Sequence, residues 1–477
     1  MKKLIALLLV IVSLGAVLCS CTTNNSDKIS GETTSAIPIY TPTFTGEFDF
    51  EGVEIKFIVG EADSSYPLSQ LSISAEEDSG NIISSAVYKR NLTFQQRYNC
   101  KISLVEVVEN GMKNVAAPSL MAGADDYDIL GARQRDDIDL CLEGYCLDLN
   151  TLSDYGADFI EIDQPWWGTE YIDNMMCNGK LYWLTGVLSL RYISSTKCIA
   201  VNSRLYEQHL LDKYGEIFDI VKSGRWTLDL LCEMASQVSN NNNTNMEVWG
   251  LKVNTLDDTL DAFARGYGVR YSHENADGTI SFDLTDANDD YIAFMNKMLG
   301  VSQQDYSLFV TSDSMETPRF ENGEILFEST SFQYAHRNLR EMNDRFVVVP
   351  LPKKDTASDY VTTVEDSNLL FGISYCTPLV CESAVVLEGL ASSSYRSTMP
   401  IYYDEALRYT YTRNEDVAEM TDIIRNSITT DLAYAFAGYI GFTSFTSQNF
   451  SKDILQSLKG HQDSWIQRFN GIIDAPE

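Results

Sequence analysis

The pattern of apolar and polar positions predicts strands alternating with helices after a polar N-terminal region. Val53–Val59 alternates and is rich in β-branched residues, as in a strand, and Asn81–Tyr98 has apolar residues at helical spacing. Lys101–Val107 and Tyr127–Leu130 predict two more strands, and Asp137–Leu147 predicts a helix. Strands that alternate with helices indicate a largely parallel sheet with helices on its faces.

The remainder of the chain continues the same pattern, and its last hundred residues are mainly helical. The expected strands are Val248–Val253, Ile325–Glu328 and Phe346–Val349. The expected helices are Ser203–Tyr214, Thr227–Val238, Asp257–Tyr267, Asp286–Met298, Phe332–Met342, Glu382–Leu390, Asp404–Tyr411, Glu415–Ser427 and Asp453–Phe469. Asp277-Gly278 is a turn signal. Because 477 residues exceed the ~250–300 at which one core usually splits, we expect two α/β domains.

The N-terminus has the pattern of a signal peptide, with Met1-Lys2-Lys3 before the apolar run Leu4–Leu18. The run is about 15 residues long, short of the ~20 that a membrane-spanning helix needs. Leu18-Cys19-Ser20-Cys21 is similar to a bacterial lipobox, after which Cys21 would be lipidated and become the mature N-terminus. Cys19 is a rival site, but it follows bulky Leu18, whereas Cys21 follows small Ser20. A plain secretory signal is the alternative.

The first two segments are therefore expected to be a signal peptide, residues 1–20, and a lipidated N-terminus with a flexible tether, residues 21–45. Thr22–Thr45 is rich in Thr, Ser, Asn and Pro and would span on the order of 25–30 Å. The mature chain is expected at the outer face of the cell membrane, or on the periplasmic side if the cell has an outer membrane.

The charge balance is strongly acidic, with 35 Lys and Arg against 68 Asp and Glu and a net charge of −33. Such a surface repels phosphate backbones and anionic lipid headgroups, so a nucleic-acid partner is not expected. Acidity of this kind also keeps a surface protein soluble.

Eight cysteines follow the signal region: Cys100, Cys141, Cys146, Cys177, Cys198, Cys232, Cys376 and Cys381. An even number outside the cell permits disulfides, but no CxxC pair occurs and many of these cysteines lie in apolar stretches, which favours buried thiols. His209, His273, His336 and His461 are far apart in the sequence, so neither a metal site nor a cofactor is expected.

Catalytic signatures are absent from the sequence: there is no HExxH, no GxSxG and no P-loop. Pairs such as Asp125-Asp126 and Asp289-Asp290 offer carboxylates, but adjacent aspartates point apart, which indicates solvated surface rather than a glycosidase pair. His273–Gly278 has part of a calcium-loop pattern, but Leu284 stands where that loop needs Glu, so an ordinary hairpin turn is expected. We expect no catalysis.

Aromatic residues gather near turns between Asp148 and Thr227. Trp166-Trp167 follows Gln164-Pro165, Asn178–Gly186 is a turn leading into an aromatic strand, and Ser223–Thr227 contains Trp226. Aromatic faces stack on sugar rings while neighbouring polar groups bond the hydroxyls, so at least one of these rings is expected to line a cleft. Packing in the core is the alternative for each ring taken singly.

The order of these segments resembles the family-1 extracellular solute-binding proteins of ABC importers. The order is PWW, NGKLYWLTG, an AVN strand that leads into a helix, and GRWTLDLL. Phe320–Phe327 resembles the family segment F-x-x-G-x-A-x-M, although Leu326-Phe327 replaces its smaller, Met-ending form, and Val347–Pro352 resembles its PLP strand. The resemblance runs from about Phe48 to the C-terminus.

The resemblance implies a periplasmic-binding-protein-like α/β fold, with two α/β lobes joined by crossing strands around a ligand cleft. Lobe 1 would be mainly residues 46–197 and lobe 2 mainly 198–320, and residues 321–477 would return between the lobes and end in C-terminal helices. The chain would cross between lobes near Lys197–Asn202 and Glu316–Glu328. Ligands of open α/β sheets bind beyond the carboxyl ends of strands.

The function that the resemblance implies is a lipid-anchored receptor, most simply a monomer, that binds a mono- or oligosaccharide by closure and delivers it to ABC permease subunits. The candidate ligand-binding residues are Glu61, Asp63, Arg133, Trp166, Trp167, Tyr182, Trp183, Arg191, Trp226, Tyr267, Ser329 and Phe332. Three alternatives stay open: a non-sugar solute such as a peptide, polyamine or lipid-like molecule, a surface glycoside hydrolase, and a sensor or adhesion lipoprotein without a transporter.

Overall fold

A computed structural model describes most of the chain after residue 47. The described residues are 48–60, 73–75, 81–107, 111–238, 248–255, 258–275, 279–282, 288–311, 318–407, 415–450 and 454–473. All of them belong to one compact unit, Thr41–Glu477. The predicted signal peptide, Cys21, the tether and the Asp277-Gly278 turn lie outside the described residues. None of the helices in the described ranges is both long and apolar enough to cross a membrane.

The first sheet has the strand order β11-β3-β1-β2. Its strands are β1 (Glu54–Gly60), β2 (Lys101–Val107), β3 (Ile129–Arg133) and β11 (Leu369–Ile373). β1 is parallel to β2 and to β3, whereas β11 is antiparallel to β3. The parallel core of this sheet was predicted, but its edge strand β11 was not, because it comes from a segment more than two hundred residues further along the chain.

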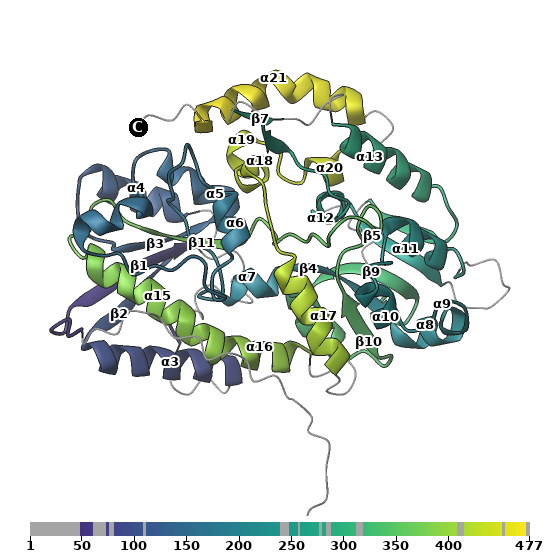
Figure 1. The fold of residues 1–477 in the computed structure, drawn as a ribbon, viewed down its shortest axis with the longest axis horizontal. Helices are drawn as coiled ribbons and strands as arrows, with labels where there is room; N and C mark the ends of the chain where they lie inside the picture. The colour runs from purple at the N-terminus through teal and green to yellow at the C-terminus, as the bar shows by residue number, and fades with distance from the viewer. Residues whose placement is uncertain are drawn as a thin grey trace, which may run out of the picture. The chain divides into compact units, whose positions relative to one another are not determined.

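Helices cover both faces of the first sheet. α3 (Ile82–Tyr98) contacts β2 and α15 (Val380–Arg396) contacts β11, and the two helices lie side by side, whereas α4 (Met112–Met121) contacts β1 from the other side (Figure 1). The side chain of Asn81 caps α3 by accepting from the backbone N–H groups of Ile83 and Ser84. Gly389 of α15 allows a close approach to α3, because a Cβ at Gly389 would lie 2.3 Å from the ring of Phe94.

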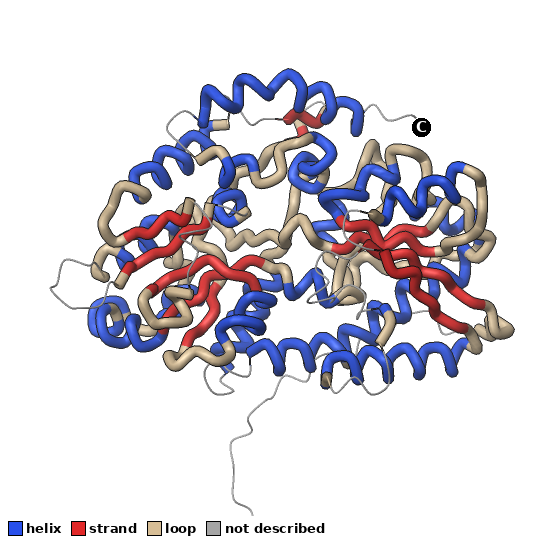
Figure 2. Tube along the Cα trace, turned by 180° about the vertical axis from the view of Figure 1, so that it is seen from behind, coloured by secondary structure: helices blue, strands red, loops and turns tan. Residues whose placement is uncertain are grey.

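The second sheet has the strand order β10-β4-β9-β5-β8 and is the larger of the two (Figure 2). Its strands are β4 (Lys197–Asn202), β5 (Trp249–Asn254), β8 (Ser307–Val310), β9 (Ile325–Ser331) and β10 (Phe346–Val349), and a separate hairpin pairs β6 (Ser272–Glu274) with β7 (Ile280–Phe282). β9, β5 and β8 are parallel, whereas β4 is antiparallel to both of its neighbours, β9 and β10. Every residue of β4 is buried, as expected for a central strand.

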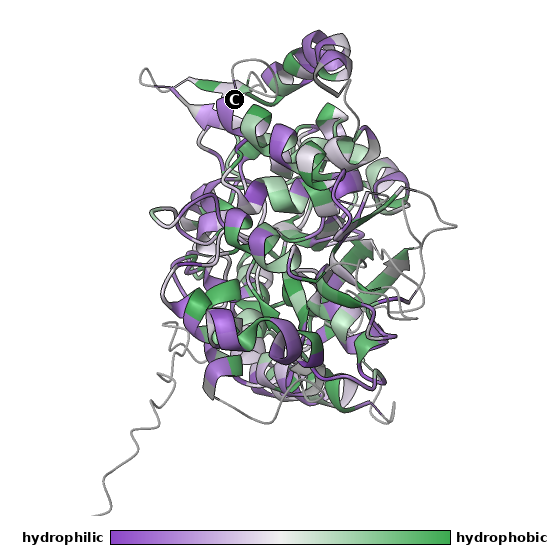
Figure 3. Ribbon diagram, turned by 90° about the vertical axis from the view of Figure 1, so that its right-hand side faces the viewer, coloured by the Kyte–Doolittle hydropathy of each residue, from purple (hydrophilic) through white to green (hydrophobic). Residues whose placement is uncertain are grey.

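The remaining helices before β10 are mostly short. They are α5 (Gln134–Asp137), η1 (Ile138–Cys141), η2 (Leu149–Tyr155), α6 (Thr169–Asp173), α7 (Leu190–Ser194), α8 (Ser203–His209), α9 (Leu211–Tyr214), α10 (Ile217–Lys222), α11 (Leu228–Ala235), α12 (Thr259–Gly266), α13 (Asp289–Val301), α14 (Phe332–Tyr334) and the π-helical η4 (Ala335–Leu339). Figure 3 shows that the helices carry both hydrophobic and hydrophilic residues, as amphipathic helices do.

The predicted helix Asp137–Leu147 is wrong. The chain forms the last residue of α5 and then the 3-10 helix η1, and Cys146 pairs as an isolated bridge with Ser374 beside the first sheet. Gly144 has a φ of 79°, in the left-handed region, so the helical conformation ends before it. The chain after η1 is therefore held by a bridge to a distant segment and does not continue as a helix.

The last part of the chain is helical, as predicted. Its helices are α16 (Thr398–Leu407), α17 (Glu415–Asn426), α18 (Leu432–Ala435), α19 (Ala437–Ile440), α20 (Phe445–Gln448) and α21 (Ile454–Ile473). α17 contacts β10, α19 contacts α5, and α21 contacts β7 and α19.

Three extended segments run side by side where the chain passes between the sheets. Thr196 pairs with Val364, and the Lys197 N–H donates to the Thr363 carbonyl at 3.0 Å. Thr362 pairs in turn with Ile428. The predicted crossing at Lys197 begins at this bundle of connections. The predicted limits of the lobes stay predictions. The second sheet begins at Lys197, one residue before residue 198, the predicted start of lobe 2.

Candidate functional site

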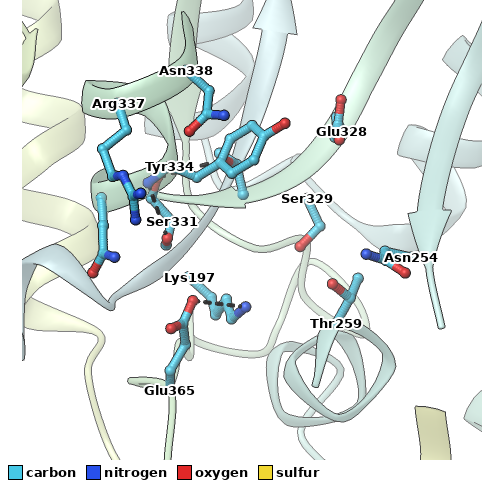
Figure 4. A pocket seen from close by; sticks show the side chains of 12 residues that line it. Lys197, Asn254, Thr259, Glu328, Ser329, Ser331, Tyr334, Arg337, Asn338 and Glu365 are labelled. Carbon is cyan, nitrogen blue, oxygen red and sulfur yellow. Dashed lines mark hydrogen bonds and ion pairs between the residues drawn. The ribbon is translucent and has the colours of Figure 1, made fainter. Parts of the chain in front are cut away.

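A polar pocket lies at the edge of the second sheet where β5 and β9 end. Its volume is about 180 Å³, and Figure 4 shows its lining side chains converging from β4, β5, β9 and the segment after β9. The lining residues are Lys197, Asn254, Thr259, Glu328, Ser329, Thr330, Ser331, Gln333, Tyr334, Arg337, Asn338 and Glu365.

The strand directions explain why these residues meet. Asn254 is the last residue of β5 and Ser331 the last of β9, and these two strands are parallel, so their carboxyl ends share one edge. Because β4 is antiparallel to β9, its first residue Lys197 lies opposite Ser331 at the same edge. This is the edge at which open α/β sheets place their ligands.

Two lysines form ion pairs with carboxylates at the pocket. The Lys197 ammonium lies 2.7 Å from the Asp258 carboxylate and 3.1 Å from that of Glu365. The Lys252 ammonium lies 2.7 Å from the Glu328 carboxylate, and both of these side chains are buried. Each carboxylate that lines the pocket therefore has a lysine ammonium beside it.

Ser329 offers a hydroxyl to the pocket. Its Oγ is buried and, within the part of the chain that the structure describes, has no hydrogen-bond partner. Figure 4 shows this hydroxyl pointing into the space between Lys197 and Thr259. Since buried polar groups are normally hydrogen-bonded, a group of this kind at a pocket wall is suited to bond a polar ligand.

Asp366, next to Glu365 in the sequence, is also electrostatically unusual. Burial raises the pKa of the Asp366 carboxyl to about 7, although the Arg135 guanidinium, 3.4 Å away, acts in the opposite direction. The loop that supplies Glu365 to the pocket therefore carries a neighbour that titrates near neutral pH.

The four tryptophans proposed from the sequence are all buried, at 5% exposure or less. The indole N–H groups of Trp166 and Trp167 each donate to the Glu388 carboxylate of α15 at 2.8 Å. Trp183 donates to the Ile138 carbonyl at 3.0 Å, and Trp226 donates to the Pro350 carbonyl at 2.8 Å. None of the four lines the polar pocket, and their assignment as ligand contacts stays a prediction.

Of the other proposed residues that the structure describes, only Ser329 lines the polar pocket. Arg191 is buried on α7 and reaches the pocket indirectly, because its guanidinium donates to the Gln333 side chain at 2.7 Å. Phe332 is buried against Tyr403, with ring centroids 5.9 Å apart.

Arg133 and Tyr267 are buried elsewhere, Arg133 in an ion pair with Asp136 at 2.8 Å and Tyr267 against Phe294. Glu61 and Asp63 lie outside the described residues. These assignments as ligand contacts stay predictions as well.

Sequence reasoning missed most of the pocket. Asn254 directly follows an expected strand, so the strand-end rule could have found it. Lys197, Arg337 and Glu365 carried no such signal, because only the pairing of β4 with β9 and the path of the chain after Val364 bring them to the pocket.

A second, larger cavity of about 510 Å³ lies in the first lobe, at the edge where Ile373 of β11 ends. Tyr182 lines it, together with Cys141, Cys146 and Cys177. Ile373 pairs with Ile129, the first residue of β3, so this edge is opposite to the carboxyl ends of β1 and β3. Among the described residues, no group of His, Cys, Asp and Glu is arranged to hold a metal ion.

Comparison with known proteins finds no matching family model and no matching curated protein. Solved structures do match. An extracellular solute-binding protein from Staphylococcus aureus in complex with maltose has a TM-score of 0.57 at 12% identity, over 87% of this chain and 98% of its own. An ABC substrate-binding protein from Listeria monocytogenes in complex with cycloalternan has a TM-score of 0.53 at 14% identity, over 88% and 99%.

This chain has the fold of these solute-binding proteins. UgpB from Mycobacterium tuberculosis, in complex with glycerophosphocholine, shares it too, with a TM-score of 0.54 at 16% identity, over 87% of this chain and 98% of its own. The predicted periplasmic-binding-protein-like α/β fold is therefore confirmed. At these identities the likeness concerns the fold, and the ligand has to be argued from the pocket.

Proposed function

We propose that this chain is an extracellular solute-binding receptor of an ABC importer and that it binds a small carbohydrate. The observation that carries the proposal is the polar pocket at the carboxyl ends of β5 and β9, in a fold shared with sugar-binding proteins. Hydroxyl and amide side chains such as Ser329, Thr259 and Asn254 match the alternating donors and acceptors of a sugar.

The size and aromatic content of the pocket favour a small sugar. A volume of about 180 Å³ is below the ~300–1,000 Å³ usual for drug-sized ligands. Among the described residues that line the pocket, Tyr334 is the one aromatic side chain, and one sugar face could stack on it. A mono- or disaccharide fits these features better than a long oligosaccharide.

Closure around the ligand would use the extended connections at Thr196, Val364 and Ile428. Lys197 and Glu365 stand at these connections and also line the pocket. A ligand bonded to Lys197 and Glu365 would make contacts whose geometry depends on these connections between the lobes. It would therefore shift the population towards one arrangement of the lobes.

The proposed anchor is the lipid on Cys21, which would hold the receptor beside the permease. Mass spectrometry of the purified mature N-terminus tests this proposal. A diacylated Cys21 is expected, whereas a mature chain that starts at Cys19, or one without lipid, would contradict it.

Calorimetric titration of the detergent-solubilised full-length protein with a panel of mono- and oligosaccharides tests the sugar proposal. We expect heat of binding with at least one small sugar. Ser329→Ala removes one hydrogen bond and should weaken binding about threefold to tenfold. Ser236→Ala, on an exposed serine that does not line the pocket, is the matched control and should leave the affinity unchanged.

The same panel should contain glycerophosphodiesters, dipeptides and polyamines, because UgpB, which has the same fold, was solved with glycerophosphocholine. If one of these solutes binds and no sugar does, the receptor proposal would stand and the sugar proposal would be overturned. Sugar binding with unchanged affinity in Ser329→Ala would indicate that the sugar binds outside this pocket.

The glycoside hydrolase alternative needs one protonated and one ionised carboxyl group across the sugar. Glu328 and Glu365 line the pocket, but each of these carboxylates forms an ion pair with a lysine. We therefore propose a receptor without catalysis. Release of nitrophenol from nitrophenyl glycosides, lost in Glu328→Gln, would contradict this.

A further inference from the structure

The first lobe has its own cavity, and none of the described residues that line it also lines the polar pocket. Its volume is about 510 Å³, within the ~300–1,000 Å³ usual for small-molecule sites. The buried part of its lining is apolar and consists of Cys141, Cys146, Leu147 and Cys177. The more exposed part is mainly polar or aromatic. Sites for small molecules commonly combine an apolar lining with a few polar groups in this way.

The walls of this cavity are connected to one another by backbone hydrogen bonds. The cavity is formed by three parts of the chain: 141–151, 177–182 and Tyr375. The Tyr375 N–H donates to the Tyr145 carbonyl at 3.0 Å, and the Leu149 N–H donates to the Leu181 carbonyl at 2.7 Å. The Leu181 N–H in turn donates to the Asp148 carboxylate at 3.1 Å. The cavity is therefore formed before a ligand enters, which lowers the entropic cost of binding.

Two tyrosines from different parts of the chain line the cavity. Tyr375 follows β11 and is 67% exposed, so its ring is accessible to a ligand. Tyr182 is partly buried, and burial raises the pKa of its phenol to about 12. The phenol therefore stays protonated at neutral pH and is able to donate a hydrogen bond. Aromatic rings of this kind offer an apolar face together with a polar tip.

A tight turn brings two polar side chains to the same cavity. Asn178 and Gly179 have positive φ values of 51° and 73°, and Cys177 and Lys180 exchange backbone hydrogen bonds across them, as in a type I′ turn. The Asn178 amide and the Lys180 ammonium both belong to the cavity lining. The amide donates and accepts hydrogen bonds and the ammonium donates them, which suits a ligand with several hydroxyl groups.

The charges around the cavity favour a neutral ligand. The Lys180 ammonium lines it together with the carboxylates of Glu143 and Asp148, so a charged ligand of either sign would meet a like charge there. The net charge of −33 also disfavours anionic polymers. A neutral molecule with apolar faces and hydroxyl edges matches this lining, and a sugar ring has both.

We propose that the cavity of the first lobe is a carbohydrate site of its own, which binds one end of a neutral oligosaccharide. Tyr182 and Tyr375 pack against the apolar faces of the sugar rings, and Asn178 and Lys180 bond their hydroxyls. The cavity lies at the edge of the first sheet opposite to the carboxyl ends of β1 and β3. Binding there does not require a sugar in the polar pocket.

Binding of the detergent-solubilised full-length protein to an array of immobilised neutral oligosaccharides tests the proposal. We expect the wild type to bind at least one of them. Tyr375→Ala and Tyr182→Ala should each weaken this binding about threefold to tenfold, because each removes an aromatic face. Tyr155→Ala is the matched control and should bind as the wild type does, since Tyr155 is 51% exposed and does not line the cavity.

The three buried thiols of the lining report whether the oligosaccharide occupies this cavity. Their alkylation by iodoacetamide is followed by peptide mass spectrometry in the wild-type protein, with and without the oligosaccharide and with the same detergent in both samples. Cys141, Cys146 and Cys177 should react severalfold more slowly when it is present. Cys232, on α11, should react at the same rate in both samples.

Three results would overturn the proposal: no binding on the array, unchanged binding in both tyrosine variants, or unchanged alkylation of the three thiols. Protection of these thiols by a dipeptide and by no oligosaccharide would also overturn it, because the cavity would then be a peptide site. The alkylation needs only the wild-type protein, so a variant that fails to fold does not prevent the test. Sugar binding in the polar pocket responds to Ser329→Ala, so either proposal can fail alone.

Discussion

The aromatic segment around Trp166 and the polar pocket around Ser329 differ in how their polar groups are hydrogen-bonded. In the aromatic segment every tryptophan N–H is bonded to a protein acceptor, as the two indoles on Glu388 illustrate. In the pocket, hydroxyl and amide side chains line an open space, and the Ser329 hydroxyl has no hydrogen-bond partner among the described residues. The tryptophans are thus held in place by hydrogen bonds within the protein, whereas the pocket has a buried hydroxyl for which we propose a ligand as the partner.

The difference has a physical reason. A buried indole contributes a large apolar area and one donor, and when the donor is bonded and the ring faces are covered by the core, neither is exposed to a ligand. Strand ends, by contrast, present side chains whose partners are not supplied by the sheet. The comparison makes three predictions, given in order of decreasing expected effect.

Trp166→Ala should produce the largest loss of stability, about 4 kcal/mol, because it removes a fully buried ring and the bond to Glu388. Trp166→Phe keeps a ring and loses only the bond, so it should cost less. Urea unfolding followed by far-UV circular dichroism measures both. Wild-type stability combined with lost sugar binding would show that this ring contacts ligand, and the comparison would fail.

Lys252→Met should destabilise the protein by about 3 kcal/mol, because it leaves the buried Glu328 carboxylate without this lysine. The double variant Lys252→Met/Glu328→Gln should recover part of the loss, since the charge is removed as well. Urea midpoints of the two variants decide the matter. Equal midpoints for the single and double variants would mean that the pair is not coupled, and that the pocket wall is looser than described.

Glu388→Gln should reduce the dependence of stability on pH. Burial raises the pKa of Glu388 to about 7, despite the bonds from Trp167, the Glu161 N–H and Trp166, which lower it. The folded protein therefore binds a proton that the unfolded chain has released, and stability falls as pH rises from about 4.5 to about 7, by on the order of 2 kcal/mol. Thermal midpoints at pH 5 and pH 8 measure this difference.

The variant should show a smaller difference between the two midpoints than the wild type. Asp366, whose pKa is raised in the same direction, remains in both proteins, so the change isolates Glu388. At pH 5 the variant should be about 1 kcal/mol less stable, because the amide has one acceptor oxygen for two indole donors. An undiminished pH dependence would assign the effect to other carboxyl groups.

Much of the secondary structure follows from local pattern. β2 and β10 have the bounds that the sequence predicted, α3 begins one residue later, and β1 is shifted by one residue at both ends. These elements have clear alternation or helical spacing. The π-helical η4 inside the predicted helix Phe332–Met342 shows the limit, because a local departure from helical geometry leaves no signal in apolar periodicity.

The site was less predictable than the fold. Ser329 was found because it directly follows the end of the expected strand Ile325–Glu328, whereas Lys197 and Glu365 come to the pocket from connections between the sheets. Which strand pairs with which is decided by contacts over long sequence separations, and the sequence pattern of one strand does not encode its neighbour.

The sequence by itself determined the alternation of strands and helices, the acidic surface and, through the order of its motifs, the solute-binding fold. Only the tertiary structure decided that β11 completes the first sheet and that Glu388 accepts hydrogen bonds from both indoles. The reason is that periodicity reflects how one element is buried, whereas a site depends on which distant elements are packed together.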